Sequence, residues 1–199
     1  GTRWSRPRRL ETQTALSAEM TSEQWPRKHE SMNKALLKSE NNHHNTPPTF
    51  MEYVYSFWPS GVDLDPCSNT SSIVKAHTKW DGTIGQCGLS IQWFGNVFCN
   101  PPYKNEIPKW VEKCVSSRTT SEIVFLVPSR TDTRWFNAAL ATCDALCLVK
   151  GRLKFGEAVN AAPFPSAVFY WGKTPKAFGE AFRSLGPIVE VVPQQSTGG

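Results

Sequence analysis

Short apolar segments alternate with single amphipathic helical segments between residues 47 and 192, and this alternation constrains the fold more than any other feature. The predicted strands are residues 62–65, 96–99, 123–127, 145–149, 167–171 and 188–192. Helices are expected from about 47 to 58, from Pro108, from Thr131 or Asp132, and from Thr174-Pro175 to Gly186. Strands separated by single helices are typical of βαβ units. The sequence therefore predicts an α/β fold, with a mainly parallel sheet and helices on both faces.

The first of these helices has a clear start signal. Thr46 is followed by Pro47, which is typical of an N-cap residue with proline in the first helical turn. Apolar residues then recur on one face of the expected helix, at Phe50, Met51, Val54, Phe57 and Trp58. We expect this face to pack against the sheet.

The chain has 199 residues, which fit one ordinary domain. We expect a catalytic domain over residues 46–193 and a frayed tail over 194–199. Residues 1–45 are polar and carry four arginines before the first acid, so they are expected to form a flexible basic arm. Such an arm could track phosphates or serve only as a solubilising tail or added sequence. The start lacks an initiator methionine and an apolar signal core, which suggests a processed or excised segment of a chain that is not secreted.

Composition limits the location and the partners. A net charge of +5 and a pI near 8.9 suit a polyanionic partner, but proteins that never touch nucleic acid often carry as much. No apolar run is long enough to cross a bilayer, so no membrane partner is expected. The six cysteines lie mostly in apolar stretches and are expected to be reduced thiols of an intracellular protein, in bacterial cytoplasm or in a eukaryotic nucleus. Cys143, Cys147 and His43-His44 lack the matched pairs of a zinc site, so no metal is expected.

Asn100-Pro101-Pro102-Tyr103 gives the sharpest chemical signal, because it directly follows a predicted strand. Ligands of open α/β sheets bind beyond the carboxyl ends of strands. Asn100 offers a side-chain carbonyl oxygen and Pro101 a backbone one, while both prolines restrict the backbone. Two fixed acceptors can draw the lone pair of an aromatic amine out of conjugation, so that the amine attacks an activated methyl group in line. Tyr103 adds an aromatic face for a base extruded from a duplex.

The alternative interpretation of this segment is a proline-stiffened turn with a tyrosine packed on it. However, Asn-Pro-Pro-Tyr after a strand resembles the signature of amino-methyltransferases that act on adenine N6, cytosine N4 or glutamine nitrogen. Over roughly residues 46 to 172 the chain resembles phage-type DNA N-6-adenine methyltransferases in particular. The matching stretches are Thr46–Pro48, Asp63–Cys67, Val97–Tyr103, Leu126–Phe136, Gly151–Phe155 and Ala162–Ala167.

This resemblance implies a Rossmann-like class I methyltransferase fold and S-adenosylmethionine as the cofactor. Thr46, Pro47 and the Asp65-Pro66-Cys67 segment would bind the cofactor, together with Asn100. The glycine-rich first loop of the wider superfamily is missing here, since Cys67-Ser68-Asn69-Thr70 stands in its place. Asp65 could accept a hydrogen bond from the cofactor amino group, or it could cap a following helix.

Cationic side chains near the expected site are candidates for contact with nucleic acid. Arg130 and Arg134 flank Asp132 just after a strand and could contact phosphates, or the three could form an internal ion-pair network with helix capping. Arg152 and Lys154 are expected on one side of a hairpin turn. Together with Lys104 and Tyr103 they complete the predicted substrate contacts. Trp93, Trp110, Trp135 and Trp171 are better explained as core packing.

The sequence thus predicts transfer of methyl from S-adenosylmethionine to N6 of a flipped adenine in DNA, with Asn100, Pro101, Pro102 and Tyr103 as catalytic residues. Cytosine N4, RNA adenine and protein glutamine remain as alternative acceptors. A catalytically silent nucleic-acid-binding module is the alternative from another class. Modification of phage or mobile-element DNA follows from the resemblance alone, and the sequence leaves open whether a monomer or a weak dimer acts.

Overall fold

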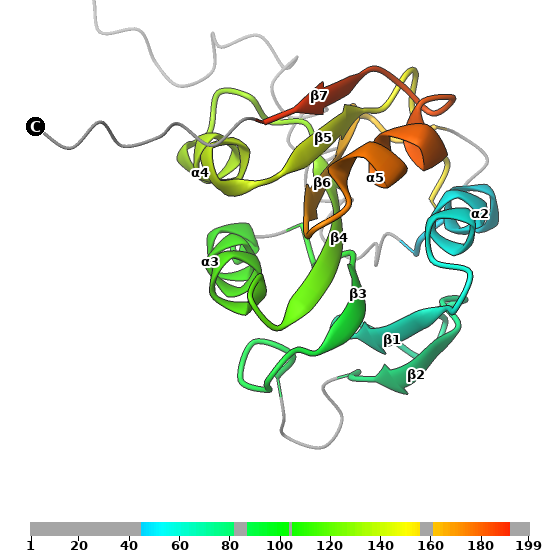
Figure 1. The fold of residues 1–199 in the computed structure, drawn as a ribbon, viewed down its shortest axis with the longest axis vertical. Helices are drawn as coiled ribbons and strands as arrows, with labels where there is room; N and C mark the ends of the chain where they lie inside the picture. Colours follow the sequence, from blue (N-terminus) through cyan, green and yellow to red (C-terminus); the bar gives the residue numbers. More distant parts are fainter. Residues whose placement is uncertain (1–44, 82–86, 104, 156–160, 192–199) are drawn as a thin grey trace, which may run out of the picture. The chain divides into compact units, whose positions relative to one another are not determined.

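Seven strands form one mixed sheet in the part of the chain that the computed structural model describes, residues 45–81, 87–103, 105–155 and 161–191. The strands are β1 Val62–Asp65, β2 Ala76–Lys79, β3 Gly95–Cys99, β4 Ser121–Pro128, β5 Ala145–Leu148, β6 Ser166–Trp171 and β7 Ile188–Glu190. Their order across the sheet is β2-β1-β3-β4-β6-β5-β7 (Figure 1). The predicted arm up to residue 44, the tail from 194 and Lys104 lie outside the described residues.

Strand direction divides the sheet into two parts. β2, β1, β3 and β4 pair in parallel, whereas β6 is antiparallel to both β4 and β5, and β7 is antiparallel to β5. β1 to β5 therefore all point the same way, and β6 and β7 run back. We call the edge at which β1 to β5 end the carboxyl edge. β6 begins at this edge, since Ser166 pairs with Pro128.

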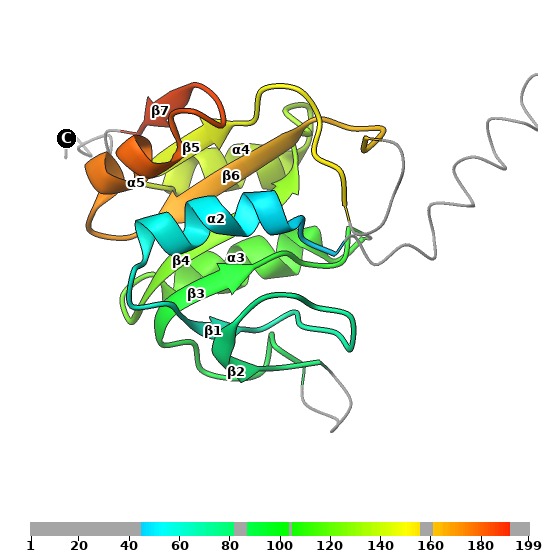
Figure 2. The ribbon, with the colours of Figure 1, turned by 90° about the vertical axis from the view of Figure 1, so that its right-hand side faces the viewer.

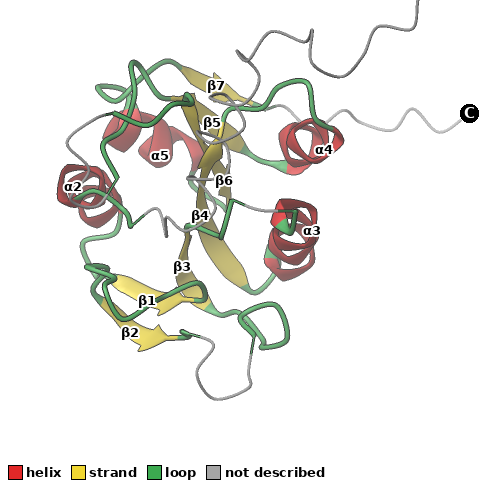
Figure 3. Cartoon of the chain, turned by 180° about the vertical axis from the view of Figure 1, so that it is seen from behind, coloured by secondary structure: helices red, strands yellow, loops and turns green. Residues whose placement is uncertain are grey.

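Four helices cover the two faces of this sheet: α2 Pro48–Phe57, α3 Ile107–Ser117, α4 Arg134–Thr142 and α5 Pro175–Phe182. α2 and α5 pack together over one face, and α3 and α4 over the other (Figures 2 and 3). The side chains of β4 alternate accordingly, because Val124 and Leu126 belong to the core under α2 and α5, while Ile123 and Phe125 belong to the core under α3 and α4. None of the described helices has the length and apolar character needed to cross a membrane.

The observed elements confirm the predicted α/β class and all six predicted strands to within about three residues at their ends. One strand, β2, was not predicted, and one helix was expected to start two or three residues too early. The helix expected to start at Thr131 or Asp132 starts instead at Arg134, because the Thr133 hydroxyl is its N-cap and accepts a hydrogen bond from the Phe136 amide.

Thr46 is also not the N-cap of α2. The N-cap is Pro47 and Pro48 is the first helical residue, and no side-chain cap is present. Proline is accommodated there because its missing N–H belongs to the turn that has no intrahelical partner. The Thr46 hydroxyl is instead engaged by another part of the chain, as described below.

Gly95, the first residue of β3, allows β3 to lie close to β1. Gly95 has φ +65°, in the left-handed region, and a Cβ atom there would collide with the Asp63 carboxylate. The close approach lets Asp63 Oδ2 accept a hydrogen bond of 2.8 Å from the Asn96 amide. The Asn96 side chain in turn donates to the Gly61 carbonyl oxygen at 3.0 Å. These contacts hold the two strands whose ends form the candidate site.

Candidate active site at the ends of β1 and β3

The candidate site lies where the order of the parallel strands reverses. From β1 the chain passes to β2 on one side, and it then returns to β3 and β4 on the other side. In open α/β sheets this reversal opens a crevice beyond the carboxyl ends of the two strands that flank it. Asp65 is the last residue of β1 and Asn100 directly follows β3. The structure thus brings together the two residues that the sequence marked as the starts of ligand loops.

Asn100 is held by a residue 54 positions earlier in the chain. Its side-chain Nδ2 donates a hydrogen bond of 3.0 Å to Thr46 Oγ1. Thr46 is buried, with 6% of its surface exposed, and it directly precedes the N-cap of α2. Pro101 is buried, whereas Pro102 is exposed. The segment before α2 and the segment after β3 therefore meet at the same point of the carboxyl edge.

Asp65 is a buried carboxylate that organises the loop after β1. Its Oδ1 accepts a hydrogen bond from the Cys67 amide at 3.2 Å, and its Oδ2 accepts one from the Ser72 hydroxyl at 3.3 Å. Burial raises the pKa of Asp65 above its ordinary value, and these hydrogen bonds oppose the rise. No helix follows β1 within the described residues, so the predicted alternative of a helix cap is wrong. Pro66 also lies in this loop, buried against Gly88.

The loop after β1 also reaches the segment before α2. Asn69 Nδ2 donates a hydrogen bond of 2.9 Å to Asn45 Oδ1. Asn45 precedes Thr46, so the Asp65 loop and the Thr46 segment are joined by side chains. The predicted cofactor-binding residues Thr46, Pro47 and Asp65–Cys67 therefore occupy one region of the carboxyl edge, close to Asn100.

Tyr103 lies half-buried in an aromatic cluster rather than on an open surface. Its ring meets Phe155 edge-on at 6.0 Å and Phe164 edge-on at 5.5 Å between ring centroids. Its hydroxyl donates to the Leu126 carbonyl oxygen at 3.4 Å. Burial raises the pKa of Tyr103 well above its ordinary value, so the phenol is neutral at physiological pH. Phe155 and Phe164 were not singled out from the sequence, although Phe155 ends one of the stretches that resemble the family and Phe164 lies within another.

Two further residues at this edge were missed because β2 was missed. Trp80 and Asp81 directly follow β2, and the Trp80 amide donates to the Asp65 carbonyl oxygen at 2.9 Å. Trp80 packs half-buried against the core under α3 and α4. The sequence signal for β2 was weak, because Ala76-His77-Thr78-Lys79 is a partly exposed outer strand with little apolar character.

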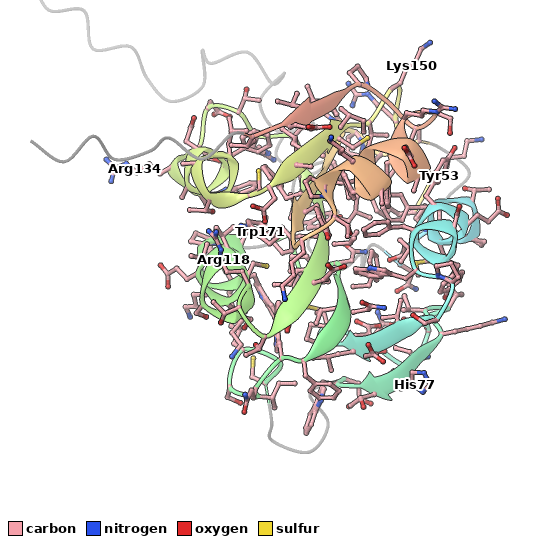
Figure 4. The ribbon with its side chains drawn as sticks, in the orientation of Figure 1. Tyr53, His77, Arg118, Arg134, Lys150 and Trp171 are labelled. Atoms are coloured by element: carbon pink, nitrogen blue, oxygen red, sulfur yellow. The ribbon has the colours of Figure 1, made fainter. Side chains whose placement is uncertain are left out.

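The predicted cationic residues are exposed at the same edge. Arg130 and Arg134 follow β4, and Arg152 and Lys154 follow β5; Lys150, which was not predicted, is exposed beside them. Arg134 and Lys150 extend away from the sheet in Figure 4. Arg130, Asp132 and Arg134 are all described, and no ion pair joins them, which argues against the internal ion-pair network considered from the sequence. These cations are exposed, and Arg152 also donates a hydrogen bond of 3.3 Å to the Ala162 carbonyl oxygen.

Arg152 and Lys154 belong to the connection between the antiparallel strands β5 and β6. Gly151 has φ +77° at its start, and the Ala162 amide donates to the Leu153 carbonyl oxygen at 2.8 Å. Arg152 and Lys154 are exposed, whereas Leu153 and Phe155 turn toward the core under α2 and α5. Residues 156–160 of this connection lie outside the described part. The two cations thus share one side of the connection.

The cysteines and tryptophans are mainly core residues. All six cysteines are free, and Cys143 and Cys147 pack into the cores on opposite faces of the sheet. Among the described residues no group of three potential ligands could hold a metal, and His43-His44 lie outside them. Trp93, Trp110 and Trp171 are buried and Trp135 packs half-buried against the core under α3 and α4, which confirms the packing interpretation for all four.

The protein is thus a mixed α/β protein whose Asn-Pro-Pro-Tyr loop offers hydrogen-bond acceptors. This loop lies at the point of the sheet where the order of the parallel strands reverses. The chain belongs to the DNA N-6-adenine-methyltransferase (Dam) family, whose family model matches residues 33–171. The suspected relationship is thereby confirmed, and the chain is assigned to the methyltransferases that modify DNA. None of the curated proteins matches the chain.

Proposed function

We propose that the protein transfers a methyl group from S-adenosylmethionine to N6 of adenine in DNA, on a Rossmann-like class I methyltransferase fold. The observation that carries the proposal is the fixed position of Asn100 at the strand reversal, where its amide donates to buried Thr46. Membership in the family supports the same reaction. The five strands that share one direction, with helices on both faces, support the fold class.

Asn100 and Pro101 supply the chemistry of the acceptor amine. Asn100 uses Nδ2 to donate to Thr46, so the acceptor end of its amide, Oδ1, is turned away from Thr46 and would accept from the substrate amine. The Pro101 carbonyl oxygen is the second acceptor, and Pro101 and Pro102 limit the freedom of the backbone that carries it. Hydrogen bonds to both oxygens turn the amine lone pair out of the ring. Placement supplies most of the rate, and a strong general base is unnecessary.

The residues at the carboxyl edge fit an adenosyl cofactor with an amino-acid tail. S-adenosylmethionine supplies an electrophilic methyl group on a sulfonium when bound. Thr46, Pro47 and the Asp65-Pro66-Cys67 segment would hold the amino-acid part, since they offer a hydroxyl and a buried carboxylate for its charged groups. Trp80 offers an aromatic face and Asp81 a carboxylate at the end of the second strand, which is where acidic residues of nucleotide-binding sheets accept ribose hydroxyls.

The aromatic cluster and the cations suit a base extruded from duplex DNA. Tyr103, Phe155 and Phe164 offer ring surfaces beside Asn100 for an unstacked adenine. The exposed arginines and lysines after β4 and β5 would contact phosphates and hold the strand in register. Lys104 is assigned the same role from its place in the sequence. A monomer or a weak dimer would both allow this mode of binding.

The test is incubation with S-adenosylmethionine labelled with tritium in the methyl group and unmethylated duplex DNA, followed by nucleoside digestion and chromatography. We expect label in N6-methyldeoxyadenosine with the wild-type protein and none with Asn100→Ala. Thermal melting of both proteins checks that the variant is folded. A Tyr103→Ala variant should also lose transfer. Full activity in both variants would overturn the assignment of the site.

The same experiment separates the alternative acceptors. Label in N4-methylcytosine would mean that cytosine, and not adenine, accepts the methyl group. Label that appears only with RNA or a glutamine-containing protein would replace DNA as the substrate. Salt-sensitive DNA binding without cofactor binding or transfer would favour a catalytically silent nucleic-acid-binding module.

A further inference from the structure

A catalytic asparagine poses an orientation problem, because the two ends of its amide have nearly the same shape and opposite chemistry. Oδ1 accepts hydrogen bonds and Nδ2 donates them. An exocyclic amine carries donor hydrogens, so Nδ2 facing it would place donor against donor. The reaction proposed above therefore requires one of the two rotamers of the Asn100 amide, with Oδ1 toward the substrate.

We propose that Thr46 is the positioning residue whose hydroxyl holds the Asn100 amide in this orientation. Thr46 Oγ1 accepts the Asn100 Nδ2–H at 3.0 Å, so the donor end of the amide is turned toward Thr46 and the acceptor end away from it. This inference rests on the proposed function and assigns Thr46 a task beyond cofactor contact. Thr46 acts through Asn100 and need not touch the substrate itself.

Three features make Thr46 suitable for this task. Its side chain is 6% exposed, so water competes little for the hydrogen bond. Pro47 and Pro48 follow it, and both restrict the backbone at the start of α2. Asn45 precedes it and accepts a hydrogen bond from Asn69 in the Asp65 loop. The hydroxyl is thus held from both sides of the sequence.

In this proposal the Thr46 hydroxyl orients Asn100, and the bulk of the side chain does not. A role in packing alone makes a different prediction, so the two can be told apart. Thr46→Val keeps the shape and removes the acceptor, whereas Thr46→Ser keeps the acceptor and removes a methyl group. If Thr46 only fills space, the valine variant resembles the wild type. If its hydroxyl orients Asn100, the serine variant does.

The first measurement is made on the free full-length protein and needs no catalysis. The side-chain amide protons of Asn100 are assigned in a ¹⁵N–¹H spectrum by their disappearance in Asn100→Ala. We expect slowed solvent exchange of one Nδ2 proton in the wild type and in Thr46→Ser. In Thr46→Val the exchange should be roughly tenfold faster, as expected for loss of one net hydrogen bond. Equal exchange in wild type and Thr46→Val would overturn the orientation.

The second measurement compares kcat for DNA methylation with the Kd for the cofactor product. Thr46→Val should lower kcat for DNA methylation roughly 100-fold, because a displaced acceptor costs about that much. Thr46→Ser should restore most of it. The Kd for S-adenosylhomocysteine without DNA should rise by no more than about tenfold, which corresponds to one lost hydrogen bond to the cofactor, so the loss in kcat should exceed the loss in affinity. A raised Kd with unchanged kcat would overturn the proposal and leave Thr46 as a cofactor contact.

The two measurements distinguish failure of this inference from failure of the proposed function. Absence of methylation by the wild-type protein would overturn both, and the exchange data would then describe only a structural hydrogen bond. Methylation by the wild type with an equal kcat in Thr46→Val would overturn the positioning role alone.

Discussion

The sulfur atoms of Cys67 and Cys99 lie 3.3 Å apart, beside the ends of the two strands that carry Asp65 and Asn100. One thiol comes from the loop after β1 and the other from the last residue of β3. Burial raises the pKa of Cys67 to about 11, and it raises that of Cys99 well above its ordinary value. Both groups are therefore neutral at physiological pH and unreactive as nucleophiles.

The raised pKa values of Cys67 and Cys99 predict that the protein loses stability in mild alkali. The folded-state pKa of Cys67 is about 11, against an ordinary value of 9.0, so the native state retains the proton longer than the unfolded chain does. The stabilising contribution is fully present below pH 9 and is lost as the pH rises toward 11. We expect the melting temperature to fall over this window. In Cys67→Ala the fall should be shallower, and an identical slope in both proteins would contradict the assignment.

Gly95 is predicted to tolerate alanine poorly. The substitution incurs the left-handed backbone penalty of about 1–2 kcal/mol and also drives a Cβ atom into the Asp63 carboxylate. Gly151→Ala is a matched control, because Gly151 has a similar φ of +77° with open space around its Cβ position. Urea unfolding should show a larger loss for Gly95→Ala. Equal losses would mean that the Asp63 contact adds nothing.

Ser166→Ala should stabilise the protein. Ser166 is 1% exposed, and its hydroxyl has no hydrogen-bond partner among the described residues. Removing a buried group that is unsatisfied recovers its desolvation cost, so we expect the free energy of unfolding to rise by about 1 kcal/mol. Ser72→Ala is the opposite case, because the Ser72 hydroxyl donates to Asp65, and it should be destabilising by about the same amount. A loss of stability in Ser166→Ala would show that the hydroxyl is satisfied by a bound molecule in solution.

The exposed cations after β4 and β5 should control DNA affinity through phosphates. Arg130→Ala and Arg152→Ala should each weaken binding to any duplex and reduce the slope of log affinity against log salt concentration by about 1. Lys176→Ala is the control, because Lys176 is exposed at the start of α5, which follows the opposite end of β6. Fluorescence anisotropy from 50 to about 200 mM salt covers the range in which such contacts change affinity strongly. If the slope is unchanged in both variants, Arg130 and Arg152 do not contact the DNA phosphates.

Strand positions proved easier to predict than strand directions. The runs that became β4 and β6 are apolar enough to be found by pattern, since all six residues of β6 are buried. A buried strand reads the same in either direction, so nothing in Ser166–Trp171 shows that it runs against β4. β2 was missed for the opposite reason, because its alternating half-exposed residues carry too little apolar character. The carboxyl-edge residues of the first strands were predicted well because they follow β1 and β3.

The role of Thr46 shows a different limit. Thr-Pro-Pro at the start of a helix is a local signal for capping, and the helix was found in the right place. The side chain does not cap it, since the N-cap is Pro47, and its hydroxyl instead accepts a hydrogen bond from Asn100, 54 residues away. Rules based on neighbouring residues cannot predict a hydrogen bond to a residue so distant in the sequence. The same holds for the cluster of Tyr103, Phe155 and Phe164, whose members lie on separate segments and meet only after the sheet has formed.

The return of β6 toward the opposite edge has an evolutionary consequence. Because β5 ends and β6 begins at the carboxyl edge, the connection between them starts and finishes at the edge that carries Asn100, and its Phe155 and Phe164 contact the Tyr103 ring. Changes in this connection that spare Phe155 and Phe164 should therefore leave the strand register and the Thr46 and Asn100 pair in place. The surroundings of Tyr103 can then change through one connection, while the sheet that carries the site is inherited unaltered.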